Sequence, residues 1–147
     1  MQNLTAEMSD KNCGVCQRIR VIVGIVIMVT IAAIHTFRIG SYLNGDLYTN
    51  YYSYASDLML PFDTYFLLCM NEFQLGFLRK WYVKALIVFS VMTFSEILQL
   101  FGVYFFGVTF DMVDILMYGI GVAFAALLDK QVFERFIPFW KLNHVTR

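Results

Sequence analysis

The stretch from Phe94 to Gly121, FSEILQLFGVYFFGVTFDMVDILMYGIG, decides the fold. It is apolar enough for a membrane, yet it contains Glu96, Gln99, Asp111 and Asp114. An ionisable side chain at membrane depth costs about 2.5 to 3.5 kcal/mol on insertion scales, so it normally faces a partner or a water-filled cavity. The stretch therefore predicts two membrane helices joined by a short uncharged loop, with polar groups gathered where the helices meet.

The composition of the whole chain agrees with a membrane protein. Of its 147 residues, 59% are hydrophobic and only 15% are charged, whereas a soluble domain usually carries about a quarter charged residues. A chain of this length is expected to form one domain, residues 1–147. The net charge is zero, so no nucleic-acid partner is expected, and no metal or cofactor motif is recognised.

Four segments are long and apolar enough to cross a bilayer, which takes roughly 20 residues in a helix. The predicted spans are residues 21–38, 52–70, 81–101 and 111–128, flanked by tails 1–20 and 129–147. The predicted fold is therefore an all-α integral membrane four-helix bundle. The apolar core of the first span, residues 21–34, also has the length of a signal peptide, but no convincing cleavage site follows it. An uncleaved helix is the preferred interpretation.

The distribution of basic residues predicts the orientation. All Lys and Arg residues except Arg38 lie in the two tails or around the loop between the second and third spans. The positive-inside rule then places both termini in the cytoplasm. Trp81 and Trp140 fall at the inner ends, and the segment VFERFIPFWK, residues 132–141, predicts a short interfacial piece. We expect a multi-pass protein of a bacterial plasma membrane.

Two small patterns have mainly structural interpretations. Cys13 and Cys16 form a CGVC motif in the polar tail. No second cysteine pair and no nearby histidine complete a metal site, so their role stays open. On the fourth span, Gly119 with Ala123 and Gly121 with Ala125 are small-xxx-small pairs that favour close helix packing.

The predicted orientation brings most polar residues of the spans to the same depth at the outer side. Glu96 and Gln99 share one helix face, as do His35 and Arg38, because residues three apart are neighbours on a helix. The candidate ligand-binding residues are Asp57, Tyr65, Glu96, Gln99, Asp114, Tyr118, His35 and Arg38.

Several of these residues also have structural interpretations. Asp111 is suited to capping the fourth helix, and Asp57, His35 and Arg38 can be solvated interface residues. Arg38 is the only side chain at this depth with a fixed positive charge. Some of the carboxylates must therefore be protonated, or a cationic group of a ligand must complete the set.

The second and third spans carry motifs that resemble the VanZ-like family of bacterial membrane proteins. In that family the second span has Asp, His four residues later and Tyr four after that, and SDLMLPFDTYFLL has Asp57, Pro61 and Tyr65. The next family motif is Glu-x-x-Gln late in the following span, which Glu96 and Gln99 match.

The fourth span carries part of the third family motif, which is Arg, then Asp, Asn and Gly. Asp114 and Gly121 match it, whereas Val108 lies near the Arg position and Tyr118 replaces Asn. The resemblance covers residues 53–128. It implies a bacterial envelope context, because the named member of the family is associated with resistance to lipoglycopeptide antibiotics.

Three functions are compatible with this sequence. The leading hypothesis is a non-enzymatic protein that binds a lipid-linked cell-wall precursor or a glycopeptide-like ligand at the outer leaflet, with membrane lipids as further partners. The alternatives are an enzyme acting on a lipid, with Glu96 as the best catalytic candidate and His35 or Asp57 as its counterpart, and a small proton-coupled transporter using Glu96 and Asp63. A homo-oligomer is compatible with each.

Overall fold

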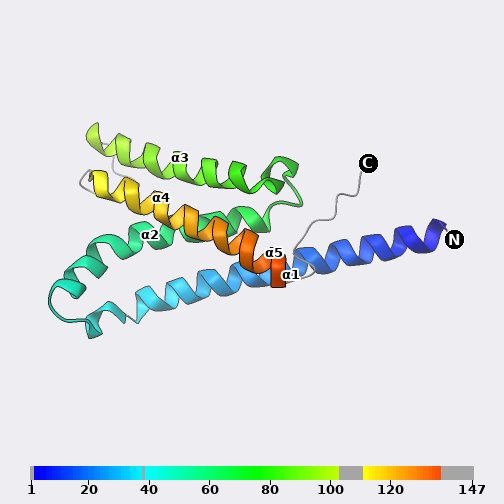
Figure 1. The fold of residues 1–147 in the computed structure, drawn as a ribbon, viewed down its shortest axis with the longest axis horizontal. Helices are drawn as coiled ribbons and strands as arrows, with labels where there is room; N and C mark the ends of the chain where they lie inside the picture. The colour runs from blue at the N-terminus through cyan, green and yellow to red at the C-terminus, as the bar shows by residue number, and fades with distance from the viewer. Residues whose placement is uncertain (1, 38, 103–110, 137–147) are drawn as a thin grey trace.

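The structure, a computed structural model, describes residues 2–37, 39–102 and 111–136, and these residues form helices and turns without strands. In Figure 1 the long helices α1, α2, α3 and α4 run roughly along one axis, and α4 crosses α2, which also contacts α1 and α3. The elements are α1 (Gln2–Thr36), η1 (Ile39–Tyr42), α2 (Asp46–Met70), η2 (Gly76–Arg79), α3 (Trp81–Leu100), α4 (Met112–Leu127), the π-helical segment η3 (Leu128–Phe133) and α5 (Glu134–Phe136).

The helices match the predicted spans closely at one end of the chain and less closely at the other. α3 and α4 begin and end within one residue of the predicted spans 81–101 and 111–128. α1 instead begins at Gln2, so most of the predicted polar tail 1–20 continues the first helix, and it extends past the rest of the bundle in Figure 1. Of the predicted interfacial segment 132–141, only residues 132–136 are described, and they follow directly from α4 in η3 and α5.

Within residues 2–37, 39–102 and 111–136, three helical segments are long and apolar enough to cross a membrane, which indicates a membrane protein. They are Gln17–Thr36, Trp81–Leu100 and Met112–Phe136. α2 is the fourth long helix, with 25 residues, but it is not among the three because its first half is rich in polar side chains. The fourth span and the orientation of the termini therefore stay predictions.

The packed core lies between α2, α3 and α4. Its buried apolar side chains are Tyr65, Phe66 and Cys69 from α2, Val88 and Met92 from α3, and Tyr118, Val122, Ala125 and Ala126 from α4. α1 adds only partly buried side chains to the edge of this core. Large apolar side chains such as Ile22, Leu86 and Phe124 are exposed on the outer helix faces, where a membrane helix presents them to lipid.

α2 and α4 approach closely at one glycine. A Cβ atom added to Gly121 would overlap the carbonyl oxygen of Leu58 and lie 2.9 Å from Cγ of Pro61. Pro61 lies inside α2, which curves along its length in Figure 1, and an internal proline is a usual cause of such bending. The small-xxx-small prediction for Gly121 is confirmed, since its lack of a side chain allows the two backbones to meet.

Candidate functional site

Most of the predicted site residues meet where α3 ends and α4 begins. We call Asp57, Glu96, Gln99, Asp114 and Tyr118 the carboxylate cluster. Glu96 is its centre and is 1% exposed. Its Oε2 accepts hydrogen bonds from Nε2 of Gln99 at 2.9 Å and from the hydroxyl of Tyr118 at 3.2 Å.

The second carboxylate oxygen of Glu96 is hydrogen-bonded to the backbone at the start of α4. Its Oε1 accepts a hydrogen bond from the backbone N–H of Asp111 at 3.0 Å. The Asp111 side chain caps the same helix by accepting from the backbone N–H of Val113 at 2.9 Å, so the capping interpretation of Asp111 is confirmed. With three donors on one carboxylate, Glu96 ties α3 to α4, and its geometry is that of a structural anchor.

Asp57 and Asp114 form the more accessible half of the carboxylate cluster. They lie close enough to interact electrostatically with one another and with Glu96. Both are only partly buried. Among the described residues, no basic side chain is ion-paired with this cluster.

The remaining predicted site residues do not join this cluster. Tyr65 contacts the opposite end of the bundle, where its hydroxyl donates to Oδ2 of Asp129 at 2.8 Å. Eight residues separate Tyr65 from Asp57, which is about 12 Å along a helix axis, so the two cannot share one depth. His35 is exposed on α1, and Arg38 lies outside the described residues.

The replacement Glu96→Gln tests the anchor interpretation. We expect it to lower the free energy of unfolding by no more than about 1 kcal/mol, because both side-chain donors can become acceptors. Gln99 can turn its Oε1, which has no hydrogen-bond partner, toward the new amide, and the Tyr118 hydroxyl can also accept. Unfolding by titration with dodecyl sulfate in mixed micelles measures the change.

The double variant Glu96→Gln/Gln99→Leu is the control for this prediction. It should lose more stability than the two single variants combined, because leucine cannot accept the new amide proton. Strict additivity would contradict the proposed exchange of donor and acceptor.

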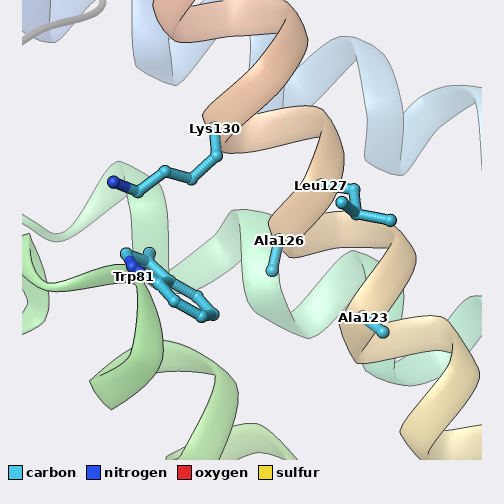
Figure 2. A pocket seen from close by; sticks show the side chains of 5 residues that line it. All are labelled: Trp81, Ala123, Ala126, Leu127 and Lys130. Atoms are coloured by element: carbon cyan, nitrogen blue, oxygen red, sulfur yellow. The ribbon is translucent and has the colours of Figure 1, made fainter.

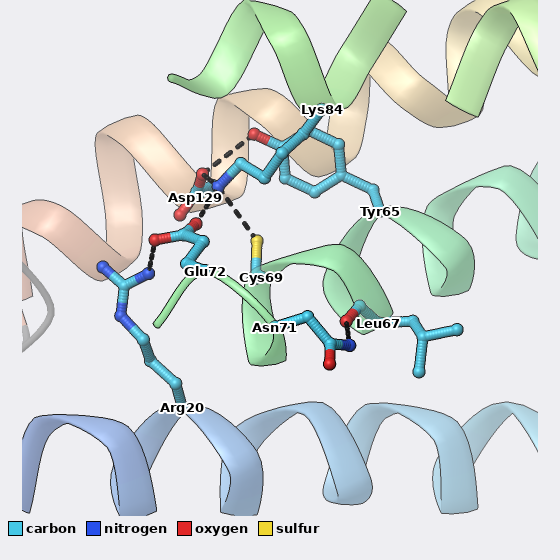
Figure 3. Close-up of polar contacts among 8 residues, drawn as sticks. All are labelled: Arg20, Tyr65, Leu67, Cys69, Asn71, Glu72, Lys84 and Asp129. Carbon is cyan, nitrogen blue, oxygen red and sulfur yellow. Dashed lines mark hydrogen bonds and ion pairs between the residues drawn. The ribbon is translucent and has the colours of Figure 1, made fainter. Parts of the chain in front are cut away.

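A second polar group, which sequence reasoning missed, lies at the other end of the bundle. We call Arg20, Tyr65, Cys69, Glu72, Lys84 and Asp129 the ion-pair cluster, and Figure 3 shows its side chains converging from α1, α2, α3 and η3 and from the loop after α2. Lys84 is its centre, at 1% exposure. Its ammonium group forms ion pairs with Glu72 and, at 2.8 Å, with Oδ2 of Asp129.

The ion-pair cluster is balanced in charge. Glu72 also pairs with Arg20 of α1, so two basic and two acidic side chains compensate one another. Burial raises the pKa of Glu72, and the neighbouring Lys84 and Arg20 act against that shift. The Lys84 ammonium group also lies 5.0 Å from the centre of the Tyr65 ring, in cation–π contact.

Three potential metal ligands fall within the ion-pair cluster. Ligand atoms of Cys69, Glu72 and Asp129 lie within 4.8 Å of one another. The Lys84 ammonium group lies among them, since it also donates to Sγ of Cys69 at 3.1 Å. In this arrangement the Lys84 ammonium group occupies the position of a metal ion and balances the charge of Glu72 and Asp129.

Sequence patterns contained a signal for this cluster. Glu72 follows the second predicted span directly, Lys84 lies in the first turn of the third, and Asp129 follows the fourth. All three were predicted at the same end, so residues of opposite charge could have been paired there. The basic residues were instead used only to orient the chain.

Two cavities lie beside the ion-pair cluster. An apolar groove of about 520 Å³ is lined by Trp81, Ala123, Ala126, Leu127 and Lys130, and Figure 2 shows these side chains along α4 and η3 and at the start of α3. A polar cavity of about 300 Å³ has Trp81 and Lys130 in its lining too. The two cavities are therefore adjacent.

Comparison with known proteins does not identify a family for this chain. No protein-family profile, curated protein or solved structure matches the sequence or the fold.

Proposed function

We propose that this chain is a VanZ-like membrane protein of the bacterial envelope that binds, without catalysis, a lipid-linked or glycopeptide-like ligand through the carboxylate cluster. In this proposal all four long helices cross the membrane with both termini in the cytoplasm. α2 is long enough for this role, because its 25 residues span about 37 Å as a helix. The cluster would then face the outer leaflet.

The charge imbalance between the two ends of the bundle carries this proposal. The ion-pair cluster is internally compensated, whereas Asp57 and Asp114 lie close together and form no ion pair with a basic side chain among the described residues. A cationic or hydroxyl-bearing ligand head would complete such a pair. Glu96 is less suited to contact a ligand, or to act as a general base, because its oxygens are already hydrogen-bonded.

A lipid-linked cell-wall precursor with a free lysine amine in its peptide is the suitable probe. We expect Asp57→Asn/Asp114→Asn to weaken binding by roughly tenfold or more, because a hydrogen bond to a charged group contributes about 1.5 to 3 kcal/mol. Native mass spectrometry of the protein in detergent micelles measures the dissociation constant. The same precursor with an acetylated amine should bind the unmodified protein as weakly as the double variant does.

Asp46→Asn is the matched control. Asp46 is an exposed acid in the first turn of α2, so its loss removes a charge from the same end of the molecule without touching the cluster. Wild-type affinity in the Asp57→Asn/Asp114→Asn protein, or equal loss in Asp46→Asn, would overturn the proposed site.

A further inference from the structure

The polar cavity beside the ion-pair cluster has an excess of positive charge. Arg20, Lys84, Glu72 and Asp129 in its wall are balanced by one another. The rest of its charged lining consists of Arg79, Lys80 and Lys130 against a single acid, Glu134. The three basic side chains are exposed, so the cavity offers cations to a ligand from outside the bundle.

These three exposed basic side chains differ in their contacts with other residues of the protein. The Lys80 ammonium group lies 5.8 Å from the centre of the Tyr82 ring, in cation–π contact. Among the described residues, neither Arg79 nor Lys130 forms an ion pair. Arg79 and Lys130 are therefore the best placed to bind an anionic group.

The apolar groove provides the second half of a binding site. Its wall is formed by Ala123, Ala126 and Leu127 of α4 and by the ring of Trp81. The small alanine side chains leave the groove open beside α4, as Figure 2 shows. α3 and α4 both belong to segments apolar enough to cross a membrane, so this wall is suited to a hydrocarbon chain.

Two residues join the groove to the cationic cavity. Trp81 and Lys130 line both, and Figure 2 shows the long Lys130 side chain extending on the Trp81 side of the groove. An apolar slot that leads directly to a cluster of cations matches an amphiphile with an anionic head and an acyl chain. Basic pockets between membrane helices are known to bind anionic lipid head groups.

We propose that the apolar groove and the cationic cavity together form a binding site for one anionic phospholipid. Its phosphate contacts Arg79 and Lys130, and one acyl chain lies against Trp81 and Ala123. This site is separate from the carboxylate cluster and does not depend on the ligand proposed for that cluster.

Trp81 itself reports occupancy of the site. The chain has two tryptophans, so a Trp140→Phe protein carries Trp81 alone. This protein is reconstituted into phosphatidylcholine vesicles that contain either dibrominated phosphatidylglycerol or dibrominated phosphatidylcholine. Bromine quenches indole fluorescence only at contact, so the ratio of quenching by the two lipids gives the relative affinity of the site for the anionic head.

We expect the brominated phosphatidylglycerol to quench Trp81 more strongly, and Arg79→Gln/Lys130→Gln to reduce its relative affinity by roughly tenfold or more. Each basic residue near a membrane surface contributes about fivefold to the attraction of anionic lipid. The matched control is Arg18→Gln/Arg135→Gln, which removes two exposed cations outside the cavity and should keep the preference.

A second variant tests the groove independently of the charges. Ala123 is exposed, so Ala123→Phe fills the groove without entering the core, and it should reduce quenching by both lipids. Equal quenching by the two lipids in the Trp140→Phe protein would overturn the proposal. An equal loss of lipid preference in Arg79→Gln/Lys130→Gln and in its control Arg18→Gln/Arg135→Gln would overturn it too. Complete loss of the quenching by phosphatidylglycerol on addition of inorganic phosphate would also overturn it.

Discussion

Replacing Lys84 with methionine is expected to lower the free energy of unfolding by about 3 to 5 kcal/mol. Lys84 is 1% exposed, and its ammonium group pairs with both Glu72 and Asp129. Methionine fills a similar volume but removes the ammonium group from two buried acids, of which Glu72 stays paired with Arg20. Titration with dodecyl sulfate in mixed micelles, followed by circular dichroism, measures the loss.

Two further variants show whether charge is the cause. Lys84→Met/Asp129→Asn should regain part of the stability, because the second change removes the charge of one of the two acids that faced the ammonium group. Lys130→Met is the same substitution at an exposed lysine next to Asp129, and its effect in lipid-free detergent should stay within about 0.5 kcal/mol. If Lys84→Met were as mild as Lys130→Met, the ion-pair cluster would not stabilise the fold.

The second large effect is expected at the contact between α2 and α4. Gly121→Ala should lower the free energy of unfolding by about 2 to 3 kcal/mol, because a new methyl group in a packed site forces backbone shifts. The methyl group would overlap the Leu58 carbonyl oxygen and lie 2.9 Å from Cγ of Pro61, and neither a backbone atom nor a proline ring can turn away. The same titration measures the change.

Gly119 provides a matched control on the same helix. A Cβ at Gly119 would lie 3.5 Å from the Phe89 ring, which is ordinary van der Waals contact. Gly119→Ala should therefore leave stability unchanged or raise it by up to about 1 kcal/mol through the higher helix propensity of alanine. A similar loss at both glycines would mean that helix flexibility, and not the close approach of α2 and α4, explains the result.

The sequence predicted α3 and α4 well because local signals mark their ends. Asp111 caps α4 as expected, and the apolar runs stop close to the helix ends. α1 begins well before the predicted first span, because a polar segment without proline can continue an apolar helix. Hydropathy alone therefore identifies the part of a helix that lies in lipid and not the whole helix.

The candidate sites were predicted less completely, because helix-face spacing does not show how far apart residues lie along a helix axis, and the sequence does not show which buried charges form ion pairs. Glu96, Gln99 and Tyr118 meet as their spacing suggested, because neighbouring helices bring residues of similar depth together. Tyr65 was assigned to the wrong end, because a spacing of four residues was used without its rise along the axis. The sequence indicates for Lys84 only a charge at the inner end of a span, because its burial depends on tertiary contacts that no local pattern specifies.

The arrangement of the ion-pair cluster along the chain determines the order in which its ion pairs can form during synthesis. Lys84 lies 12 residues after Glu72 and 45 residues before Asp129, so its first partner already exists when it leaves the ribosome. The Glu72–Lys84 ion pair can thus form within the segment from α2 to α3, and Arg20, which is synthesised earlier, can join Glu72 there. Asp129 arrives last, and we expect the bundle to close only when the end of α4 reaches Lys84.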